Sequence, residues 1–389
     1  MLNMDEKHTG EAIKTRLLTI IEPYCSVVDR KKITITTDSG ANMLKAVEGM
    51  NNFRCLCHRL NTSISDGWSE SMDENIDISN LNTAVTDLLN SLSKATDIQK
   101  KLPVKVKSGP HTRAWRGLIT KFKSVSISLE TLKSAVDEKR KKYVYAIDKD
   151  HLESVCTLLL KFEPIFDLLE KSKEPSLNYA VTSYYAMKNF LQASNNDSRM
   201  VQVLKENLVH SIDMKFFTSL TPLHYAACFL DCRYKSLKFL NGEEKELKMA
   251  EIKKEMQSLV PEVIRIEINA ASQAQPKPKT SKTDTLLAFE DSSDEECLTG
   301  TTLDEEISRY MAIKEKFQNP LEFWVKYEEK LPQLHSVAQK IFSIQASSSL
   351  SERIFTFSGK INSKERSRLS PTTLSCLTQL KSARLNNVL

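Results

Sequence analysis

Two helices are predicted from the stretch Ser347-Ser-Ser-Leu-Ser-Glu-Arg-Ile-Phe-Thr-Phe-Ser-Gly-Lys-Ile-Asn-Ser-Lys-Glu-Arg-Ser-Arg-Leu-Ser-Pro371, together with the apolar run that follows it to Leu385. Ser349 or Ser351 can cap the first helix, and Glu352 in its first turn suits the positive end of a helix. Gly359 is expected to end this helix. Its expected buried residues are Ile354, Phe355 and Phe357.

The second helix is predicted from Ser370-Pro371, which combines a capping serine with proline at the first helical position. Leucines then recur at helical spacing, at Leu374, Leu377 and Leu380. The connection between the two helices is basic, and it is either a solvated loop or one that faces phosphate. Its cationic residues are Lys360, Lys364, Arg366 and Arg368.

This stretch resembles the C-terminal dimerisation segment of hAT-superfamily DNA transposases, the hobo/Activator group. The pattern of the family is Ser-x-x-Ser-Glu-Arg-x-Phe-Ser-x-x-Gly, then Arg-x-Arg-Leu-Ser-Pro, then Leu-x-x-Leu. The matching residues are Ser348, Ser351, Glu352, Arg353, Phe355, Gly359, Arg366, Arg368, Leu369, Ser370, Pro371, Leu377 and Leu380. Thr356 stands where serine is usual. The resemblance implies that Glu352 is the last of three metal-binding acids.

An α-β-α-β unit is predicted near the beginning of the chain. Thr9 can cap a helix that runs to about Tyr24, and an alternating run at 33–37 predicts a short strand that ends at Asp38. A helix is expected over 39–47, closed near Gly49, and a second strand over 53–57. This order favours parallel strands.

The same region resembles the hAT family at two further motifs. Thr37-Asp-Ser-Gly-Ala-Asn-Met43 is similar to Thr-Asp-Asn-Ala-Ala-Asn-Met of the family, and Cys55-Leu-Cys-His-Arg-Leu-Asn61 to its Cys-x-x-His-x-Leu-Asn. The resemblance implies an RNase H-like fold with Asp38 as the second catalytic acid. Open α/β sheets place their chemistry at the carboxyl ends of strands, as expected here.

Cys55-x-x-His58 also invites a zinc interpretation, with Cys57 and Cys25 nearby. A closed zinc site needs four ligands, and no second Cys/His pair follows at finger spacing. We therefore predict structural roles for both residues, with Cys55 as a buried strand cysteine and His58 as an orienting histidine.

The middle of the chain reads as almost entirely helical. A loop is expected over 68–77 and a helix over 81–101, and helical periodicity continues from about 118 to 254. The family carries an all-helical domain inserted between its second and third acids, and this region fits that insertion. Thr112, Arg113 and Trp115 resemble the family's Thr-Arg-Trp turn, with Ala114 inserted. The DNA-binding candidates are Arg113, Trp115, Arg116, Arg366 and Arg368.

A linker is predicted over 273–302, where Pro276 and Pro278 precede the acidic run at 290–296. Ser292 and Ser293 in that run are candidate sites for an acid-directed kinase. The stretch after the linker, 319–332, resembles the family's Asp-Pro-Leu-x-Trp-Trp helix.

The predicted fold class is α/β plus all-α, an incomplete RNase H-like core interrupted by a large helical insertion. We divide the chain into a truncated RNase H-like part (1–117), the helical insertion (118–272), the acidic linker (273–302) and the dimerisation segment (303–389) that completes the core. Apolar content is 40% and net charge is +5, so a sizeable core is expected, and nucleic-acid contact is permitted but not required. No signal peptide or membrane span is expected, and eight cysteines without paired spacing fit a reducing compartment.

RNase H-like nucleases hold two divalent ions with carboxylates. In the family the first acid lies on a strand well before the His-Thr-Gly segment, which here is His8-Thr9-Gly10, so we expect this acid and its strand to be missing. Asp38 and Glu352 would then be vestigial as catalytic and metal-binding residues. We predict a truncated transposase-derived protein without transposase activity and with no cofactor, whose remaining function is partner binding. The alternative is an active hAT transposase that uses Mg²⁺ or Mn²⁺, with the missing acid supplied by a longer form.

The predicted partners are a second copy of the chain or related transposase-like proteins. Association is expected to depend on concentration and to be lost on deletion after Gln345. The candidate dimerisation residues, some of which the same pattern would equally place in the core, are Phe323, Trp324, Phe355, Leu374, Leu377 and Leu380.

A third interpretation is a DNA binder without catalysis. Its cations would be Lys101, Lys105, Lys107, Arg113, Arg116, Lys121 and Lys123, which are alternatively a solvated basic face. Lys139-Arg-Lys-Lys142 is either a nuclear address or a helix surface, and the predicted location is nuclear, otherwise cytoplasmic.

Overall fold

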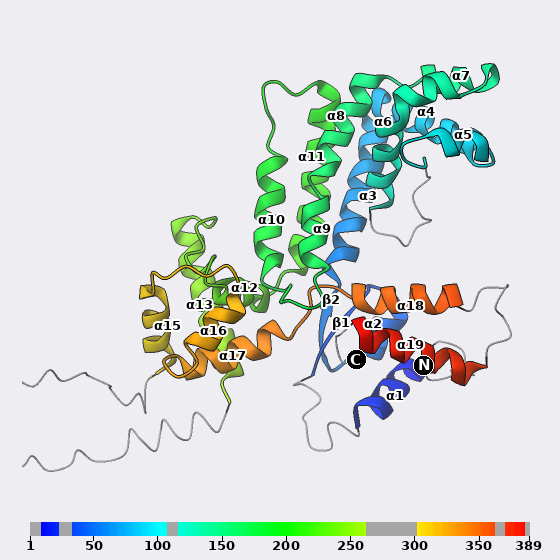
Figure 1. The fold of residues 1–389 in the computed structure, drawn as a ribbon. Coiled ribbons are helices and arrows are strands. Elements are labelled where there is room, and N and C mark those ends of the chain that lie inside the picture. Colours follow the sequence, from blue (N-terminus) through cyan, green and yellow to red (C-terminus); the bar gives the residue numbers. More distant parts are fainter. Residues whose placement is uncertain (1–8, 23–32, 107–115, 262–301, 362–369, 386–389) are drawn as a thin grey trace, which may run out of the picture. The chain divides into compact units, whose positions relative to one another are not determined.

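The computed structural model describes residues 9–22, 33–106, 116–261, 302–361 and 370–385, and it is mostly helical (Figure 1). The chain forms two compact units. Unit 1 comprises 1–221 and 344–389, and unit 2 comprises 222–343. The predicted insertion over 118–272 therefore has helices in both units. None of the described helices is both long enough and apolar enough to cross a membrane.

Unit 1 contains a two-stranded sheet. Strand β1 (Thr34–Thr37) pairs in parallel with β2 (Asn51–Arg54), which confirms the predicted direction. Between them lies α2 (Ala41–Ala46), and α1 (Gly10–Ile21) packs against α2. The Oγ1 of Thr9 accepts a hydrogen bond from the Ala12 backbone at 3.2 Å, as expected of the cap. This sheet is too small to establish an RNase H-like core.

Helix α3 (Leu56–Glu74) continues through the region where we predicted a loop, so that prediction was wrong. The segment is polar, but Trp68 is 4% exposed and packs on Phe122 with ring centroids 4.9 Å apart. Gly67 lets α3 approach α11 (Arg199–Lys215) closely, because a Cβ at Gly67 would lie 2.9 Å from Leu208 Cα. Tertiary packing therefore extends α3 beyond its apolar periodicity.

The remaining helices of unit 1 form a helical bundle and a C-terminal pair. The bundle contains α4 (Ile76–Leu92), α5 (Thr96–Lys101), α6 (Gly117–Ala135), α7 (Glu138–Tyr145), α8 (Lys149–Leu160), α9 (Glu163–Leu169), α10 (Tyr179–Phe190) and the short 3-10 helix η3 (Phe217–Ser219). The pair consists of α18 (Ser349–Ile361) and α19 (Pro371–Leu385). Ser370 caps α19 as predicted, since its Oγ accepts from the Thr373 backbone at 3.2 Å. Gly359 does not end α18, which continues to Ile361.

Unit 2 contains α12 (Pro222–Leu230), α13 (Gly242–Leu259), α15 (Leu303–Ala312), α16 (Pro320–Lys326) and α17 (Pro332–Phe342). Its core contains Tyr310, Phe323 and Trp324, whose rings contact one another. Two buried polar groups of this cluster donate to carbonyls of α12: Tyr310 Oη to Phe229 and Trp324 Nε1 to Leu230, each at 2.9 Å. These bonds fix α15 and α16 on the end of α12.

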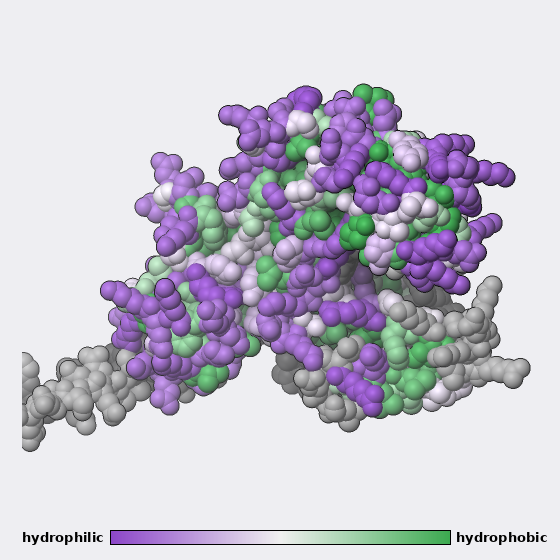
Figure 2. Space-filling model, turned by 45° about the horizontal axis from the view of Figure 1, so that its top comes forward, coloured by the Kyte–Doolittle hydropathy of each residue, from purple (hydrophilic) through white to green (hydrophobic). Residues whose placement is uncertain are grey.

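The surface of the protein is mainly hydrophilic on the face that Figure 2 shows. Hydrophobic residues gather there in smaller patches among the hydrophilic ones.

Candidate functional site

The carboxyl ends of β1 and β2 are joined to the segment that leads into α18. Thr36 Oγ1 donates to the Gln345 carbonyl at 2.8 Å, and the Leu56 backbone donates to the Ala346 carbonyl at 2.9 Å. Residues about 290 to 310 positions apart in the sequence are thereby held at one end of the sheet. This is the sheet end at which the sequence predicts Asp38 and Glu352 to meet.

Asp38 directly follows β1, and its Oδ1 accepts a hydrogen bond from the Gly40 backbone at 3.0 Å. The side chain is partly exposed. Its carboxylate is thus oriented by the turn that precedes α2, next to solvent.

Glu352 and His58 lie in the first turns of α18 and α3. His58 Nε2 is 3.3 Å from Glu352 Oε1, and the Ser348 hydroxyl donates to the same oxygen at 3.4 Å. A glutamate from the last part of the chain is therefore held by a histidine from the first part. The orienting role predicted for His58 stays a prediction, and this contact is where such a role would act.

The electrostatics connect Asp38 to this pair. Burial lowers the pKa of the His58 imidazole, and the negative charge of Asp38 acts in the opposite direction. Burial raises the pKa of Glu352, the Ser348 hydrogen bond lowers it, and the charges of Asp38 and Glu170 raise it. Asp38, His58 and Glu352 therefore lie within electrostatic reach of one another.

The His58–Glu352 separation would suit an ion pair, but both pKa shifts favour the neutral forms. Burial is the largest contribution to each shift, and a single contact in a half-buried site does not outweigh it. Near neutral pH we assign a neutral imidazole that donates from Nε2 to an ionised carboxylate.

These residues do not make a complete metal site. Among the described residues, no three histidine, cysteine, aspartate or glutamate side chains are grouped so that they could hold a metal ion. Oε1 of Glu352 already contacts His58 Nε2 and accepts a hydrogen bond from the Ser348 hydroxyl. Since two-metal nuclease chemistry needs several carboxylates around the ions, we derive no step through Mg²⁺ or Mn²⁺ here.

The two cysteines of the motif are buried, but Cys55 is not in the strand predicted over 53–57: β2 ends at Arg54, and Cys55 is the N-cap residue of α3. Cys55 Sγ accepts a hydrogen bond from the Ser348 backbone at 3.3 Å, which ties the end of β2 to the start of α18. Burial raises the pKa of Cys55 and of Cys57, so both thiols stay protonated at neutral pH. Cys25, the third cysteine considered for zinc, lies outside the described residues.

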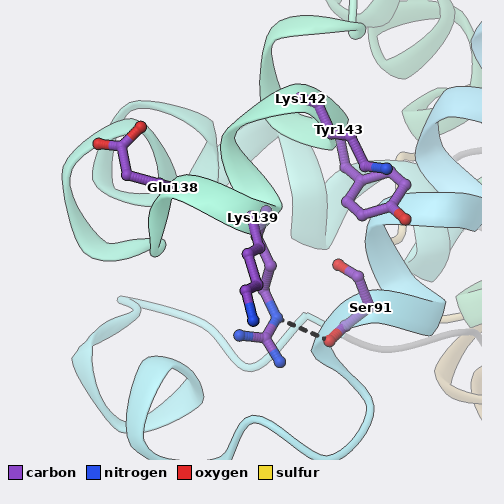
Figure 3. A pocket seen from close by; sticks show the side chains of 6 residues that line it. Ser91, Glu138, Lys139, Lys142 and Tyr143 are labelled. Carbon is purple, nitrogen blue, oxygen red and sulfur yellow. Dashed lines mark hydrogen bonds between the residues drawn. The ribbon is translucent and has the colours of Figure 1, made fainter.

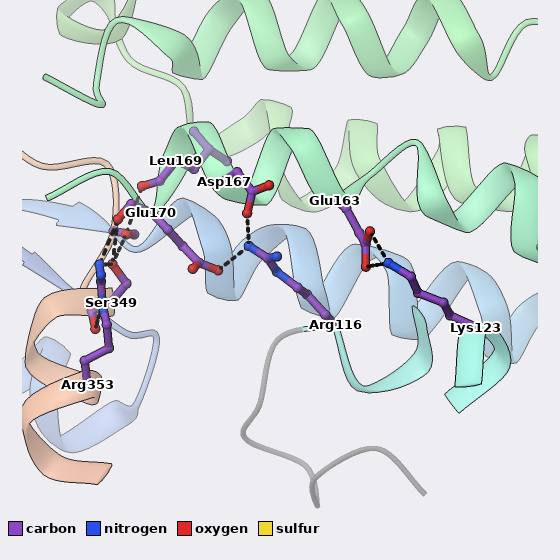
Figure 4. Close-up of polar contacts among 9 residues, drawn as sticks. Arg116, Lys123, Glu163, Asp167, Leu169, Glu170, Ser349 and Arg353 are labelled. Atoms are coloured by element: carbon purple, nitrogen blue, oxygen red, sulfur yellow. Dashed lines mark hydrogen bonds and ion pairs between the residues drawn. The ribbon is translucent and has the colours of Figure 1, made fainter. Parts of the chain in front are cut away.

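Glu170, at the end of α9, is a neighbour of the site that sequence reasoning missed. Its carbonyl accepts from Arg353 Nη2 at 2.9 Å and from the Ser349 hydroxyl at 3.3 Å, and Arg116 Nη2 donates to its carboxylate at 3.1 Å (Figure 4). Arg116 also pairs with Asp167 at 2.7 Å. No periodicity or motif marked Glu170, because only the fold brings the end of α9 to the start of α18.

The predicted DNA-binding residues have mixed placements. Arg113, Trp115, Arg366 and Arg368 lie outside the described residues, as does Lys107. Arg116 is neutralised by the two carboxylates just described, Lys123 pairs with Glu163 at 2.8 Å, and Lys121 donates to Asn82 and Thr86. Lys101 and Lys105 are exposed. DNA binding by this set remains a prediction, with three members already engaged within the protein.

The candidate dimerisation residues fall into two classes. Phe323 and Trp324 are 0% and 3% exposed inside unit 2, as core residues are. Phe355, Leu377 and Leu380 are 61%, 37% and 53% exposed, and Leu374 is half-buried. The prediction that Phe355 is buried is therefore wrong. Helix α18 packs on α19 through other residues, such as Ser358, and leaves the Phe355 side chain exposed.

Comparison with known proteins gives one family match and two relatives. Residues 302–383 match the hAT family C-terminal dimerisation region. The chain is 24% identical over 225 residues to the transposable element Hobo transposase of Drosophila melanogaster, an alignment that covers 58% of this chain and 34% of that protein. It is 39% identical over 74 residues to the putative transcriptional regulator tpeD of Talaromyces stipitatus, covering 19% of this chain and 9% of that one. The chain thus spans about a third or less of these curated relatives.

Proposed function

We propose, from the premise that this chain is an hAT-family transposase-derived protein, that it self-associates through its C-terminal helices and does not by itself catalyse strand cleavage or transfer. The observation that carries the proposal is the exposed apolar face of α18 and α19. It lies within the residues that match the hAT dimerisation region.

This face is defined by Phe355, Leu377 and Leu380, which we call the α18–α19 face. The two helices pack on each other, and a hydrogen bond of 3.0 Å joins the buried hydroxyls of Ser358 and Thr378. Their own contact thus uses other residues and leaves the large apolar side chains exposed. Aromatic side chains such as Phe355 are enriched in the buried core of protein interfaces.

A second copy of the chain is the proposed partner. The test is sedimentation equilibrium of the full chain over a range of concentrations, with Phe355→Ser and Leu380→Ser combined. We expect the dissociation constant to rise at least about tenfold, since losing two central apolar contacts costs more than about 1.4 kcal/mol.

A matched control is available in the same region. Leu321 and Val325 on α16 are 39% and 73% exposed, within the same family match. The combined Leu321→Ser and Val325→Ser variant should associate like the unsubstituted chain. A monomeric unsubstituted chain at high concentration, or equal losses in both double variants, would contradict the proposal.

We also propose a fold for unit 1: β1, β2, α3 and α18 belong to an RNase H-like core. Two observations support this fold. The two strands pair in parallel, and Glu352 lies at the carboxyl end of the sheet, where Asp38 follows β1. The experimental structure of a longer form, with further strands beside β1, would test this.

Metal-dependent strand cleavage is the second candidate, and one observation favours it. The charge of Asp38 acts on both Glu352 and His58, so the two acids share one site as an hAT enzyme would require. A nicking assay with Mg²⁺ or Mn²⁺ tests it, with Asp38→Asn and Glu352→Gln as controls. Cleavage abolished by either substitution would establish the enzyme, whereas cleavage unaffected by both would reject it. Nuclear location, proposed for either function, is tested by imaging the tagged chain.

A further inference from the structure

Strand β1 pairs with β2 along one edge, and the direction of its backbone groups shows what its other edge offers. The Cys55 N–H donates to the Thr37 carbonyl at 2.6 Å, and the register sets Thr37 opposite Arg54. The N–H and C=O of one residue in a strand point to the same edge, and successive residues alternate between the two edges. The backbone groups of Ile35 and Thr37 therefore face β2, and those of Thr34 and Thr36 face outwards.

The outward groups of Thr34 and Thr36 bond to no other residue in the described part of the chain. Thr36 does contact the segment before α18, but through its side chain: Oγ1 donates to the Gln345 carbonyl at 2.8 Å. Side chains of a strand point to the faces of the sheet, so this contact leaves the edge unobstructed. An unpaired strand edge is a template for pairing with another chain.

Strand β1 has none of the features that keep natural strand edges apart. Its sequence is Thr-Ile-Thr-Thr, so every side chain is β-branched and none is charged. Natural edge strands are protected by lysine, by proline or by a bulge, and β1 has none of the three over Thr34–Thr37. Both its composition and its regular pairing therefore favour the addition of a further strand.

The surface of α7 shows how a charged surface differs. There Lys139, Arg140 and Lys142 line a shallow cavity, and Arg140 Nε donates to the Ser91 carbonyl at 3.0 Å (Figure 3). A two-fold contact sets a surface against its own copy, so three cations of this kind would repel one another. The neutral edge of β1 carries no such penalty against itself.

We propose that the outer edge of β1 binds the same edge of a second copy of the chain, as an antiparallel pair centred on Ile35. Thr34 of each copy then lies opposite Thr36 of the other, and each such pair exchanges two backbone hydrogen bonds. These are the two residues whose backbone groups point outwards, so the pattern is self-complementary, as a two-fold contact requires. Ile35 faces its own copy in the closer, non-hydrogen-bonded position. The two small sheets become one continuous sheet.

This contact goes beyond the proposed function, because it uses none of the residues of the α18–α19 face. A chain with two self-complementary surfaces can form assemblies larger than a dimer. The test therefore uses the double variant of the α18–α19 face described above, in which association through that face is weakened, and it measures the β1 contact at β1 itself.

The test is backbone amide hydrogen exchange, followed by NMR on the full chain at low and at high protein concentration. The amides of Ile35 and Thr37 should be protected at both concentrations, because they bond to β2 within one chain. The amides of Thr34 and Thr36 should exchange rapidly at low concentration and at least about tenfold more slowly at high concentration.

The matched variants are Thr34→Pro and Thr34→Val. Proline removes an outward N–H and leaves the ladder with β2 intact, and such edge positions tolerate proline. By symmetry it removes half of the hydrogen bonds of the contact, so the slowing at the Thr36 amide should be lost. Valine keeps the N–H and the β-branched shape, so the slowing should persist. Protection of the Ile35 and Thr37 amides shows in both variants that the sheet is folded.

Protection of Thr34 and Thr36 at every concentration would overturn the proposal, because the edge would then be covered by residues of the same chain. Rapid exchange at every concentration would overturn it too, as would equal slowing in Thr34→Pro and Thr34→Val. Failure of association through the α18–α19 face leaves this result unchanged, so the two proposals fail separately.

Discussion

His58 Nε2 lies 3.3 Å from Oε1 of Glu352, so the first turn of α3 and the first turn of α18 meet at the carboxyl end of the small sheet. A residue from the first part of the chain and one from the last part form this contact. It is the point at which the candidate site is assembled, and the burial of both side chains sets their protonation.

Replacing Asp38 by asparagine should lower the pKa of His58 and that of Glu352 together. The carboxylate of Asp38 raises both pKa values, so removing its charge removes that contribution from each. The measurement is an NMR titration of the His58 ring and of the Glu352 carboxyl carbon in both proteins. If neither value moved, Asp38 would not share a site with the pair.

The contributions of His58 and Glu352 to the free energy of unfolding should change with pH in opposite directions. His58 has a lowered folded pKa, so its contribution to the free energy of unfolding falls as the pH drops below about 6.5, where the unfolded chain takes up a proton first. Glu352 has a raised folded pKa, so its contribution rises as the pH falls through that value. Denaturant unfolding of His58→Gln and Glu352→Gln, each compared with the unsubstituted chain over pH 4 to 8, should show differences that change with pH in opposite directions.

Gly67→Ala should destabilise unit 1. The added Cβ would lie 2.9 Å from the Asn207 carbonyl oxygen and from Leu208 Cα, so α3 and α11 would have to separate. Overpacking of this kind costs about 1–3 kcal/mol and should outweigh the gain of about 1 kcal/mol in helix propensity.

The control for this substitution is Gly359→Ala in α18, where a Cβ would meet nothing within 4 Å. That variant should gain up to about 1 kcal/mol. Thermal unfolding of both proteins measures the difference. A Gly67→Ala variant as stable as Gly359→Ala would mean that the two helices are not closely packed.

Glu306→Gln should destabilise unit 2. Glu306 is 0% exposed and accepts hydrogen bonds from the Gln333 and Leu334 backbones at 3.2 and 2.9 Å, at the beginning of α17. The NH2 group of the glutamine side chain would face one of these two backbone N–H donors. That N–H group would lose its acceptor, which costs about 1–3 kcal/mol. Glu305→Gln is the matched control, since glutamine replaces glutamate equally well in its capping box with Thr302. Equal stability of the two variants in urea unfolding would contradict the role of Glu306.

Lys121 should make the free energy of unfolding rise with pH. Burial lowers the pKa of its ammonium to about 8, below the ordinary value of 10.5. Between these two values the unfolded chain binds more protons than the folded one, so stability increases with pH across that window. Lys121→Met should flatten the rise, and Lys123→Met, at a residue paired with Glu163, should leave it in place. Denaturant unfolding at pH 7.5 to 10.5 measures the slope.

Local chemistry made part of this structure predictable. Thr9 and Ser370 cap helices because a hydroxyl before a helical run can accept from the free backbone amides of its first turn. Alternation at 33–37 indicated β1, and the motifs at 37–43 and 347–371 pointed to the hAT family and to Asp38 and Glu352. All of these signals depend on residues close together in the chain.

Only the tertiary structure decided which side chains are buried, paired or exposed. Phe355 is exposed and Phe323 buried although both lie in helices with apolar periodicity, because that depends on which neighbours cover each helix. Arg116 pairs with Asp167 and Glu170, and Lys139 remains unpaired within the described residues, for the same reason. By itself the sequence determined the caps of α1 and α19, the presence and parallel order of two strands, and the family motifs, since short-range hydrogen bonding and residue pattern specify them. The folded chain decided the His58–Glu352 contact and the place of Glu170, since each depends on packing between segments far apart in the sequence.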